Sequence, residues 1–205
     1  MALETDAELM LRVKAGDEAS FDLLLEKYRT PVVKFVQRMV QNSAVAEELA
    51  QEVFLRVYRA RERYEPSARF TTWLFRIATH IALNALRDGR KERGTESLDA
   101  GRSVSDENGS DAAPLDVGDP HETIEQYLVE SSDVREIRGA VMALPGKQRA
   151  AVLMHKYHEL DYKQISEALG CSESAVKSLL FRAYETLRQR LVRFAAPSAA
   201  EAASE

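Results

Sequence analysis

The sequence contains little cysteine, glycine or proline. A single cysteine among 205 residues excludes an intramolecular disulfide and a cysteine-rich zinc site. Nine glycines and six prolines are few for this length, which disfavours an all-β fold with many tight turns. The chain also lacks a Gly-rich phosphate loop of the Walker or dinucleotide-binding type, so no nucleotide-dependent enzyme is indicated.

Long hydrophobic runs are also missing. No stretch approaches the roughly 18 apolar residues that a membrane-spanning helix requires. The N-terminus, MALETD, is acidic and lacks the basic flank and apolar core of a secretory signal. With 45% hydrophobic and 30% charged residues, the composition is that of a soluble globular protein, which we expect in the cytoplasm.

Charge is distributed unevenly along the chain. Residues 1–94 carry 16 basic and 14 acidic side chains, residues 95–130 carry one and ten, and residues 131–205 carry 11 and nine. The net charge of −5 therefore hides an acidic middle between two slightly basic ends. Residues 95–119 are rich in Ser, Gly and Asp, without an aromatic residue or an apolar period, which predicts a flexible linker. The sequence thus predicts two domains, 1–94 and 120–195, and a disordered tail over 196–205.

Apolar residues recur at helical spacing throughout the first domain. Helix boundaries are predicted from caps and breakers: a capping box at Thr5 and Glu8, a kink or restart at Pro31, an N-cap at Ser43, and a last helix from Thr71 or Thr72 to about Arg87. This last helix has an apolar face of Leu74, Ile77, Ala78, Ile81, Ala82 and Ala85.

A second face of the same helix has a different composition. Within about an 80° arc away from the apolar face lie Trp73, Arg76, His80, Asn84 and Arg87. An ordinary solvated face is the simpler interpretation. The functional interpretation is a nucleic-acid face, with cations for phosphates, an aromatic ring for stacking, and His and Asn for base edges.

Residues 161–182 have the pattern of a helix-turn-helix motif. Asp161 is predicted to cap a short helix with Ile165 and Leu169 inward, Gly170 to form the turn, and Ser172 to cap a longer helix. The outer face of the longer helix carries Glu173, Ser174, Lys177, Ser178, Phe181 and Arg182, the residue types with which a recognition helix contacts DNA. A plain αα-hairpin is the alternative.

No catalytic or metal-binding constellation is found in the sequence. His155 and His158 are three residues apart, but no nearby Cys or acidic residue completes a zinc site. Cys171 is predicted to be a small buried hydrophobe in the helix-turn-helix turn. We therefore predict no enzyme, no metal and no cofactor.

Three stretches together resemble the extracytoplasmic-function (ECF) group of bacterial sigma factors. AEELAQEVFLRVY (46–58) is similar to the core-polymerase-binding helix of that family, and FTTWLFRIA (70–78) to the start of its minus-10 recognition helix. Residues 144–188, beginning LPGKQR, are similar to its minus-35-binding helix-turn-helix domain. The similarity covers about 7–92 and 120–193.

The resemblance implies an all-α protein with a sigma-2-like helical bundle and a sigma-4-like helix-turn-helix domain. It implies a dissociable, non-catalytic subunit that gives RNA polymerase its promoter specificity and helps to melt DNA. The implied partners are core RNA polymerase, promoter DNA and, as for many family members, an anti-sigma factor.

The resemblance also implies three sets of site residues. Those for core polymerase are Glu48, Gln51, Glu52 and Leu55; those for minus-10 DNA are Phe70, Trp73, Arg76, His80 and Asn84; those for minus-35 DNA are Ser174, Lys177, Ser178, Phe181 and Arg182. His80 stands where the family usually has Asn, and Leu179 where Arg is common.

Two other functions and two interpretations of the linker stay open. The chain fits less well a stand-alone helix-turn-helix regulator with a ligand-sensing or dimerising domain, or a nucleic-acid-processing enzyme. The acidic linker is either a solvated tether or an acidic strand for the basic channel of the polymerase. Its 25 residues reach at most about 80–90 Å, which suits promoter elements about 25 base pairs, or roughly 85 Å, apart.

Overall fold

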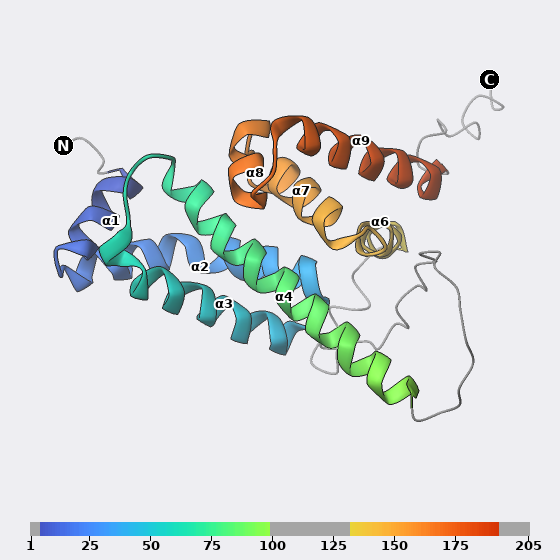
Figure 1. The fold of residues 1–205 in the computed structure, drawn as a ribbon, viewed down its shortest axis with the longest axis horizontal. Helices are drawn as coiled ribbons and strands as arrows, with labels where there is room; N and C mark the ends of the chain where they lie inside the picture. Colours follow the sequence, from blue (N-terminus) through green and yellow to red (C-terminus); the bar gives the residue numbers. More distant parts are fainter. Residues whose placement is uncertain (1–4, 99–131, 193–205) are drawn as a thin grey trace, which may run out of the picture.

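The computed structural model of the chain describes residues 5–98 and 132–192, and all the regular elements in these ranges are helices (Figure 1). The first unit consists of α1 (Asp6–Lys14), α2 (Glu18–Val40), α3 (Ser43–Arg59), the short 3₁₀ helix η1 (Arg61–Arg63) and α4 (Phe70–Leu98). The second consists of α6 (Ser132–Met142), α7 (Gly146–Tyr157), α8 (Tyr162–Leu169) and α9 (Glu173–Arg190). The predicted all-α fold is confirmed.

Parts of the predicted organisation fall outside the described residues. These are the predicted linker beyond Leu98, the first residues of the predicted second domain, and the tail over 196–205. Among the helices that are described, none combines the length and apolar character that crossing a bilayer requires.

Several predicted helix boundaries shift in the structure. Asn42, not Ser43, caps α3: its Oδ1 accepts from the Val45 N–H at 3.1 Å, and Ser43 is the first helical residue. Both residue types cap well, and it is Asn42 that has the extended backbone a cap needs. At the next helix, α4 begins at Phe70 and continues to Leu98, beyond the predicted end at Arg87.

Pro31 neither ends nor restarts a helix, because α2 runs through it from Glu18 to Val40. Residues on both sides of the proline, Tyr28 and Phe35 among them, are buried along one stripe. This shared burial holds the two halves of α2 in one helix and offsets the lost backbone hydrogen bond.

The core of the first unit forms where α2 packs against α1, α3 and α4. The predicted apolar face of α4 is turned toward it: Leu74, Ala78 and Ile81 are all buried. Phe75 joins them, edge-on to Phe35 with the ring centroids 5.2 Å apart. This packing fixes the rotation of α4, and therefore which of its residues point away from the core.

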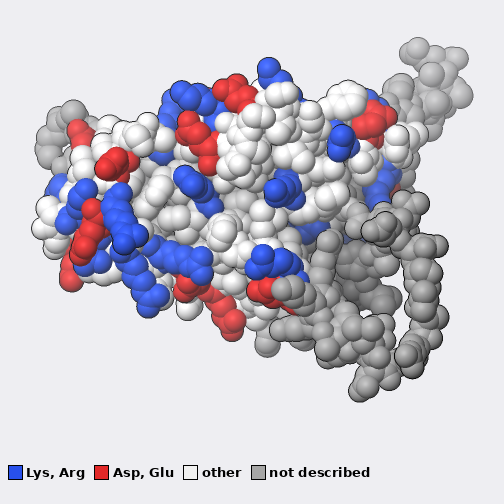
Figure 2. Space-filling model, viewed as in Figure 1, with Lys and Arg blue, Asp and Glu red and all other residues white. Residues whose placement is uncertain are grey.

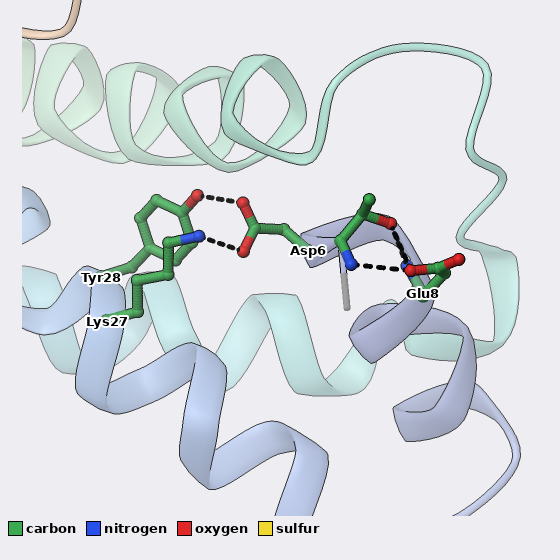
Figure 3. A network of polar contacts seen from close by, with 5 residues as sticks. Asp6, Glu8, Lys27 and Tyr28 are labelled. Atoms are coloured by element: carbon green, nitrogen blue, oxygen red, sulfur yellow. Dashed lines mark hydrogen bonds and ion pairs between the residues drawn. The ribbon is translucent and has the colours of Figure 1, made fainter. Parts of the chain in front are cut away.

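The first helix is attached to the second by a polar network (Figure 3). The Asp6 carboxylate accepts from the Tyr28 hydroxyl at 2.6 Å and from Lys27 Nζ at 2.5 Å. Burial, together with this carboxylate, raises the pKa of Tyr28 above its usual value, so the hydroxyl stays protonated and donating. The predicted capping box of α1 is present, with Thr5 and Glu8 bonded reciprocally.

The helix-turn-helix motif forms with the predicted caps. Asp161 and Gln164 make a capping box at the start of α8, Gly170 adopts the left-handed conformation at φ 63°, and Ser172 caps α9. Ile165 is fully buried, whereas Leu169 is only half-buried. These caps set the sharp turn that turns α9 away from α8.

The two units pack against each other. Helices α7 and α8 lie on α2 and α4, so that α4 is placed between the first-unit bundle and the helix-turn-helix unit (Figure 1). Buried apolar residues form one continuous core across both units. No sequence pattern predicted this contact between the units.

Candidate polymerase and nucleic-acid interfaces

The outer face of α3 brings together the four residues predicted to bind core polymerase. Glu48, Gln51, Glu52 and Leu55 follow one another at intervals of three, one and three, which places them on one side of the helix. Leu55 is 43% exposed, while its neighbours Phe54 and Val57 are buried. An exposed leucine bordered by carboxylates is a surface suited to a partner with an apolar centre and a basic rim.

On α4, the predicted minus-10 residues lie on one side but differ in exposure. Arg76 and His80, one turn apart, are both exposed, and Asn84 is partly exposed one turn further. Trp73 is half-buried, with its ring edge-on to Tyr64 at a centroid distance of 5.0 Å. The indole therefore has one packed side and one open side.

Phe70 differs from the other predicted minus-10 residues because it is only 3% exposed. Its ring centroid lies 5.3 Å from that of Tyr28 and 6.0 Å from that of Trp73. In this arrangement the ring supports Trp73 from the core side and is not brought to the surface with Arg76 and His80.

A groove of about 360 Å³ separates the exposed side of α4 from α8. Trp73, Arg76 and His80 line it from the α4 side, and Ala168 to Gly170 from the end of α8. The surface predicted to meet minus-10 DNA therefore faces another part of the same chain.

On α9, all five predicted minus-35 residues are exposed: Ser174, Lys177, Ser178, Phe181 and Arg182. Phe181 is 71% exposed, an unusual position for a phenylalanine without a partner. Leu179, where the family often has Arg, is half-buried and packs on the core instead of pointing outward. The N-terminal half of α9 thus presents a compact polar and aromatic surface.

A cluster of arginines that was not predicted from the sequence lies beside α4. Five arginines fall within 14 residues: Arg56, Arg59, Arg61, Arg63 and Arg69, which we call the arginine patch. Figure 2 shows Lys and Arg gathered at the end of the molecule where α3 meets η1. Arg61 stacks over the Tyr58 ring at 4.2 Å, and Arg56 pairs with Glu52 and lines the groove. The high density of arginine in this stretch of the sequence could have predicted the patch.

The two histidines considered for zinc have separate environments. His155 Nδ1 lies 3.1 Å from the Tyr184 hydroxyl on α9, whereas the His158 ring packs on Phe75 with centroids 4.0 Å apart. Burial, aided by the positive charge of Arg38, lowers the pKa of His158 to about 4. Within residues 5–98 and 132–192, no group of three or more His, Cys, Asp or Glu is placed to hold a metal.

Comparisons with known proteins match both units. The family model for sigma-70 region 2 matches residues 24–92, and that for sigma-70 region 4 matches residues 135–187. The RNA polymerase sigma-H factor of Pseudomonas aeruginosa is 30% identical over 190 residues, covering 92% of this chain and 94% of its own. The ECF RNA polymerase sigma-E factor of Escherichia coli is 30% identical over 188 residues, covering 91% and 94%.

Two solved structures have a similar fold. CnrH in complex with the cytosolic domain of CnrY aligns with a TM-score of 0.64 at 14% identity, over 93% of this chain and 99% of that one. The sigma factor RpoE of Bartonella quintana, in complex with the anti-sigma factor NepR, aligns with a TM-score of 0.58 at 20% identity, over 84% and 96%.

Proposed function

The chain belongs to the ECF group of sigma-70 family sigma factors, and from this premise we propose which of its residues perform each step of promoter recognition. It is an RNA polymerase sigma factor, a non-catalytic specificity subunit that binds core polymerase and promoter DNA and directs promoter-specific transcription initiation. The division of labour is residues 1–94 for core binding and the minus-10 element, and residues 120–195 for the minus-35 element.

Core polymerase binds the outer face of α3. The support is that Glu48, Gln51 and Leu55 are exposed and Glu52 partly exposed on one side of a helix whose opposite side is buried. The clamp helices of the core enzyme are the proposed partner. Leu55 supplies the apolar contact, and the carboxylates supply charge complementarity around it.

Melted minus-10 DNA lies along α4 and the arginine patch. Trp73 offers an open ring side for base stacking, Arg76 a cation for phosphate, and His80 and Asn84 hydrogen-bonding groups for base edges. Phe70 contributes indirectly, because its buried ring packs against Trp73 and positions the indole. The arginine patch adjoins this face and extends it with cations, which attract the strand without regard to sequence.

Minus-35 duplex DNA binds the N-terminal half of α9. A recognition helix enters the major groove with its first turns, where Ser174 and Ser178 reach base edges and Lys177 and Arg182 reach phosphates. Phe181 is suited to an apolar contact with a thymine methyl group. The exposure of these five residues on one capped helix is the observation that carries the proposal.

Binding to core polymerase and run-off transcription test the proposal. We expect Leu55→Asp to weaken co-purification with core polymerase by about tenfold or more, because it places a charge in the apolar centre of the interface. Leu23→Asp on α2 is the matched control, since Leu23 is a similarly exposed leucine outside the proposed surface. Equal core affinity of both variants would remove α3 from the interface. Tight binding of the free protein to a palindromic duplex would favour the stand-alone regulator instead.

The linker proposal rests on charge alone. We place the acidic stretch in the basic nucleic-acid channel of the polymerase, where it takes the position of a nucleic-acid strand. Replacing Asp99, Asp106, Glu107, Asp111, Asp116 and Asp119 with Asn or Gln should lower core affinity, weaken its salt dependence and shift the ratio of abortive to full-length RNA. A shuffled linker of unchanged composition is the control. Identical behaviour of the neutralised linker would reduce it to a tether.

An anti-sigma factor is a further proposed partner, supported by the fold shared with a sigma factor solved in complex with one. The proposed location is the cytoplasm, where bacterial RNA polymerase works. A pull-down with the full chain as bait, repeated in the presence of core polymerase, tests the first proposal. An anti-sigma factor is expected to be displaced by the core enzyme.

A further inference from the structure

Helix α1 lies outside the stretch that matches sigma-70 region 2, because that match begins at residue 24. Leu9, Met10 and Val13 bury one side of α1 in the bundle core. The helix packs on α2 and also contacts η1 and α4 (Figure 1). It therefore borders the connection between η1 and α4, residues 64–69, which we call the entry loop because it leads into the proposed minus-10 helix.

A long-range hydrogen bond joins α1 to the entry loop. Lys14, in the last turn of α1, donates from Nζ to the Tyr64 main-chain carbonyl at 3.0 Å. Tyr64 ends η1 with an extended backbone, at φ −67° and ψ 130°, so the helical pattern stops at this residue. The next three residues, Glu65, Pro66 and Ser67, are exposed, and the proline has no N–H to donate. Lys14 thus fixes the first residue of a loop that has little packing beyond it.

The ring of Tyr64 connects this hydrogen bond to the proposed minus-10 surface. Tyr64 is only 1% exposed, and its ring lies edge-on to Trp73 with a centroid distance of 5.0 Å. The same ring lies edge-on to Phe70 at 6.3 Å. Tyr64 therefore belongs to the packed side of the indole whose other side is open. A shift of the entry loop would move the ring against which Trp73 packs.

The other end of α1 reaches Trp73 through a second set of contacts (Figure 3). Asp6 accepts from the Tyr28 hydroxyl at 2.6 Å. The Tyr28 ring packs on Phe70, and Phe70 packs on Trp73, with centroid distances of 5.3 and 6.0 Å. Burial, with the Asp6 carboxylate nearby, also raises the pKa of Tyr64 above its usual value. Both ends of α1 are thus connected to the rings that hold Trp73.

We propose that α1 is a positioning element of the minus-10 site and that Lys14 is its positioning residue, holding the entry loop so that the open side of Trp73 faces the melted strand. The inference rests on the proposed function of Trp73 in base stacking. Lys14 acts through Tyr64 and does not touch DNA. An indole that is already held in place loses less conformational freedom when a base stacks on it, so a fixed loop strengthens binding. Arg63 directly precedes the loop and Arg69 ends it, so the loop also sets where two cations of the arginine patch lie.

The fluorescence of Trp73 tests the positioning in the free protein. Trp73 is the single tryptophan of the chain, so the emission reports on this site alone. We expect Lys14→Met to shift the emission to longer wavelength and to lower its anisotropy, because a loosened Tyr64 ring exposes the indole to water and lets it move. Lys14→Arg keeps a cationic donor and should restore the wild-type emission.

Arg12→Met is the matched control for the fluorescence. Arg12 is a cation on the same helix, but it pairs with Asp17 at 2.6 Å and not with the entry loop. We expect this variant to keep the wild-type emission of Trp73. Unchanged emission of Lys14→Met, or an equal shift in Arg12→Met, would overturn the proposal.

Holoenzyme binding to promoter DNA with a melted minus-10 region tests the consequence for function. We expect Lys14→Met to weaken binding about tenfold, near the lower end for the loss of a hydrogen bond from a charged donor, and Lys14→Arg to bind like wild type. The slope of log affinity against log salt should not change, because no phosphate contact is lost. A smaller slope without a shift in Trp73 emission would make Lys14 a direct phosphate contact and overturn the positioning role.

Trp73→Ala separates this inference from the proposed function. If Trp73→Ala weakens binding and Lys14→Met adds no further loss in that background, Lys14 acts through the indole. If the two losses add, or if Lys14→Met alone has no effect, the stacking function stands and the positioning proposal fails. If Trp73→Ala binds like wild type, the stacking function itself fails. Circular dichroism and co-purification with core polymerase show that each variant folds and assembles, and the fluorescence test needs no Trp73 variant.

Discussion

The two helices proposed to contact DNA are placed differently in the folded chain. On α9, Lys177, Phe181 and Arg182 project from the outer side of the helix-turn-helix unit. On α4, Arg76 and His80 border a groove whose other wall is α8. The minus-35 surface is therefore available in the free protein, whereas the minus-10 surface depends on where the second unit lies.

The difference follows from the geometry of the helix-turn-helix motif. Its two helices are packed differently: α8 lies between α4 and α9, whereas α9 has one exposed side. A motif that docks through its first helix leaves its recognition helix open. The same packing of α8 on α4 places α8 opposite the proposed minus-10 surface. One contact therefore leaves the proposed minus-35 surface exposed and restricts access to the proposed minus-10 surface.

The largest expected effect comes from removing the arginine that joins the units. Arg149→Leu deprives three carbonyl oxygens of a charged donor, and we expect a loss of about 3 kcal/mol in unfolding free energy. For a protein of this size, that loss lowers Tm by roughly 6–12 °C. Calorimetry measures the shift, and Arg182→Leu on the exposed surface is the control. Similar Tm values for both variants would mean that the Arg149 hydrogen bonds do not stabilise the folded chain.

On the exposed outer side of α9, each substitution should remove one phosphate or base contact independently of the others. We expect Lys177→Ala to weaken holoenzyme binding to minus-35 duplex DNA and to reduce the slope of log affinity against log salt by about one. Lys163→Ala on α8 is the control, since Lys163 is exposed but outside the proposed surface. The measurement is a salt titration of promoter binding. A parallel slope for Lys177→Ala and wild type would exclude a phosphate contact by Lys177.

Substitutions on the α4 face that borders the groove should change promoter sequence preference only when the protein is bound to core polymerase. We expect His80→Asn to change the preferred base at one minus-10 position by about 1 kcal/mol, because a base-edge hydrogen bond is rearranged. Core affinity should stay unchanged, since His80 lies on α4 and the proposed core surface on α3. A base-by-base promoter scan measures the preference, with Asp88→Asn on the same helix as control. Identical scans for His80→Asn and wild type would rule out a base contact by this histidine.

The smallest effect is a pH dependence of the contact between the two units, where the His158 ring packs on Phe75. The His158 pKa is lowered to about 4 in the folded chain, so its contribution to stability is full above the ordinary value of 6.5 and is lost as the pH falls from 6.5 toward 4. His158→Phe keeps a ring against Phe75 and removes the titration. Between pH 7 and pH 5 we expect the wild-type Tm to fall about 2–4 °C further than that of His158→Phe. Parallel pH curves of the two proteins would contradict the prediction.

How much of the molecule could be predicted differs between local and long-range features. The capping boxes at Thr5 and Asp161, the left-handed Gly170 and the cap at Ser172 were predicted because each depends on residues within one helical turn. The prediction of Ser43 as a cap was wrong because Asn42 beside it is equally suitable, and only the backbone conformation distinguishes them. The continuous helix through Pro31 likewise depends on packing partners far along the chain.

The same distinction applies to the proposed sites. The spacing of Glu48, Gln51, Glu52 and Leu55, and that of the α9 residues, placed each set on one helix side, and in the structure these residues are exposed, Glu52 only partly. Phe70 is four residues before Leu74 and in register with the apolar face of α4, so spacing was consistent with its burial, which the resemblance had not implied. Spacing did not indicate that Leu83 and Thr79 have packing partners on α7. These two residues belong to neither periodic face of α4, and their environment is provided by another unit.

The sequence by itself determined the helical class, most of the helix caps, the helix-turn-helix turn and the family, because these depend on short-range spacing and on motifs that lie within single segments. Only the tertiary structure decided which surfaces are open. The contact between the two units joins residues more than 60 positions apart, such as Thr79 with Met154 and Met39 with Arg149, and no local pattern marks them as partners. Burial of apolar side chains between the two units selected that contact, and with it the position of α8 opposite Trp73, Arg76 and His80.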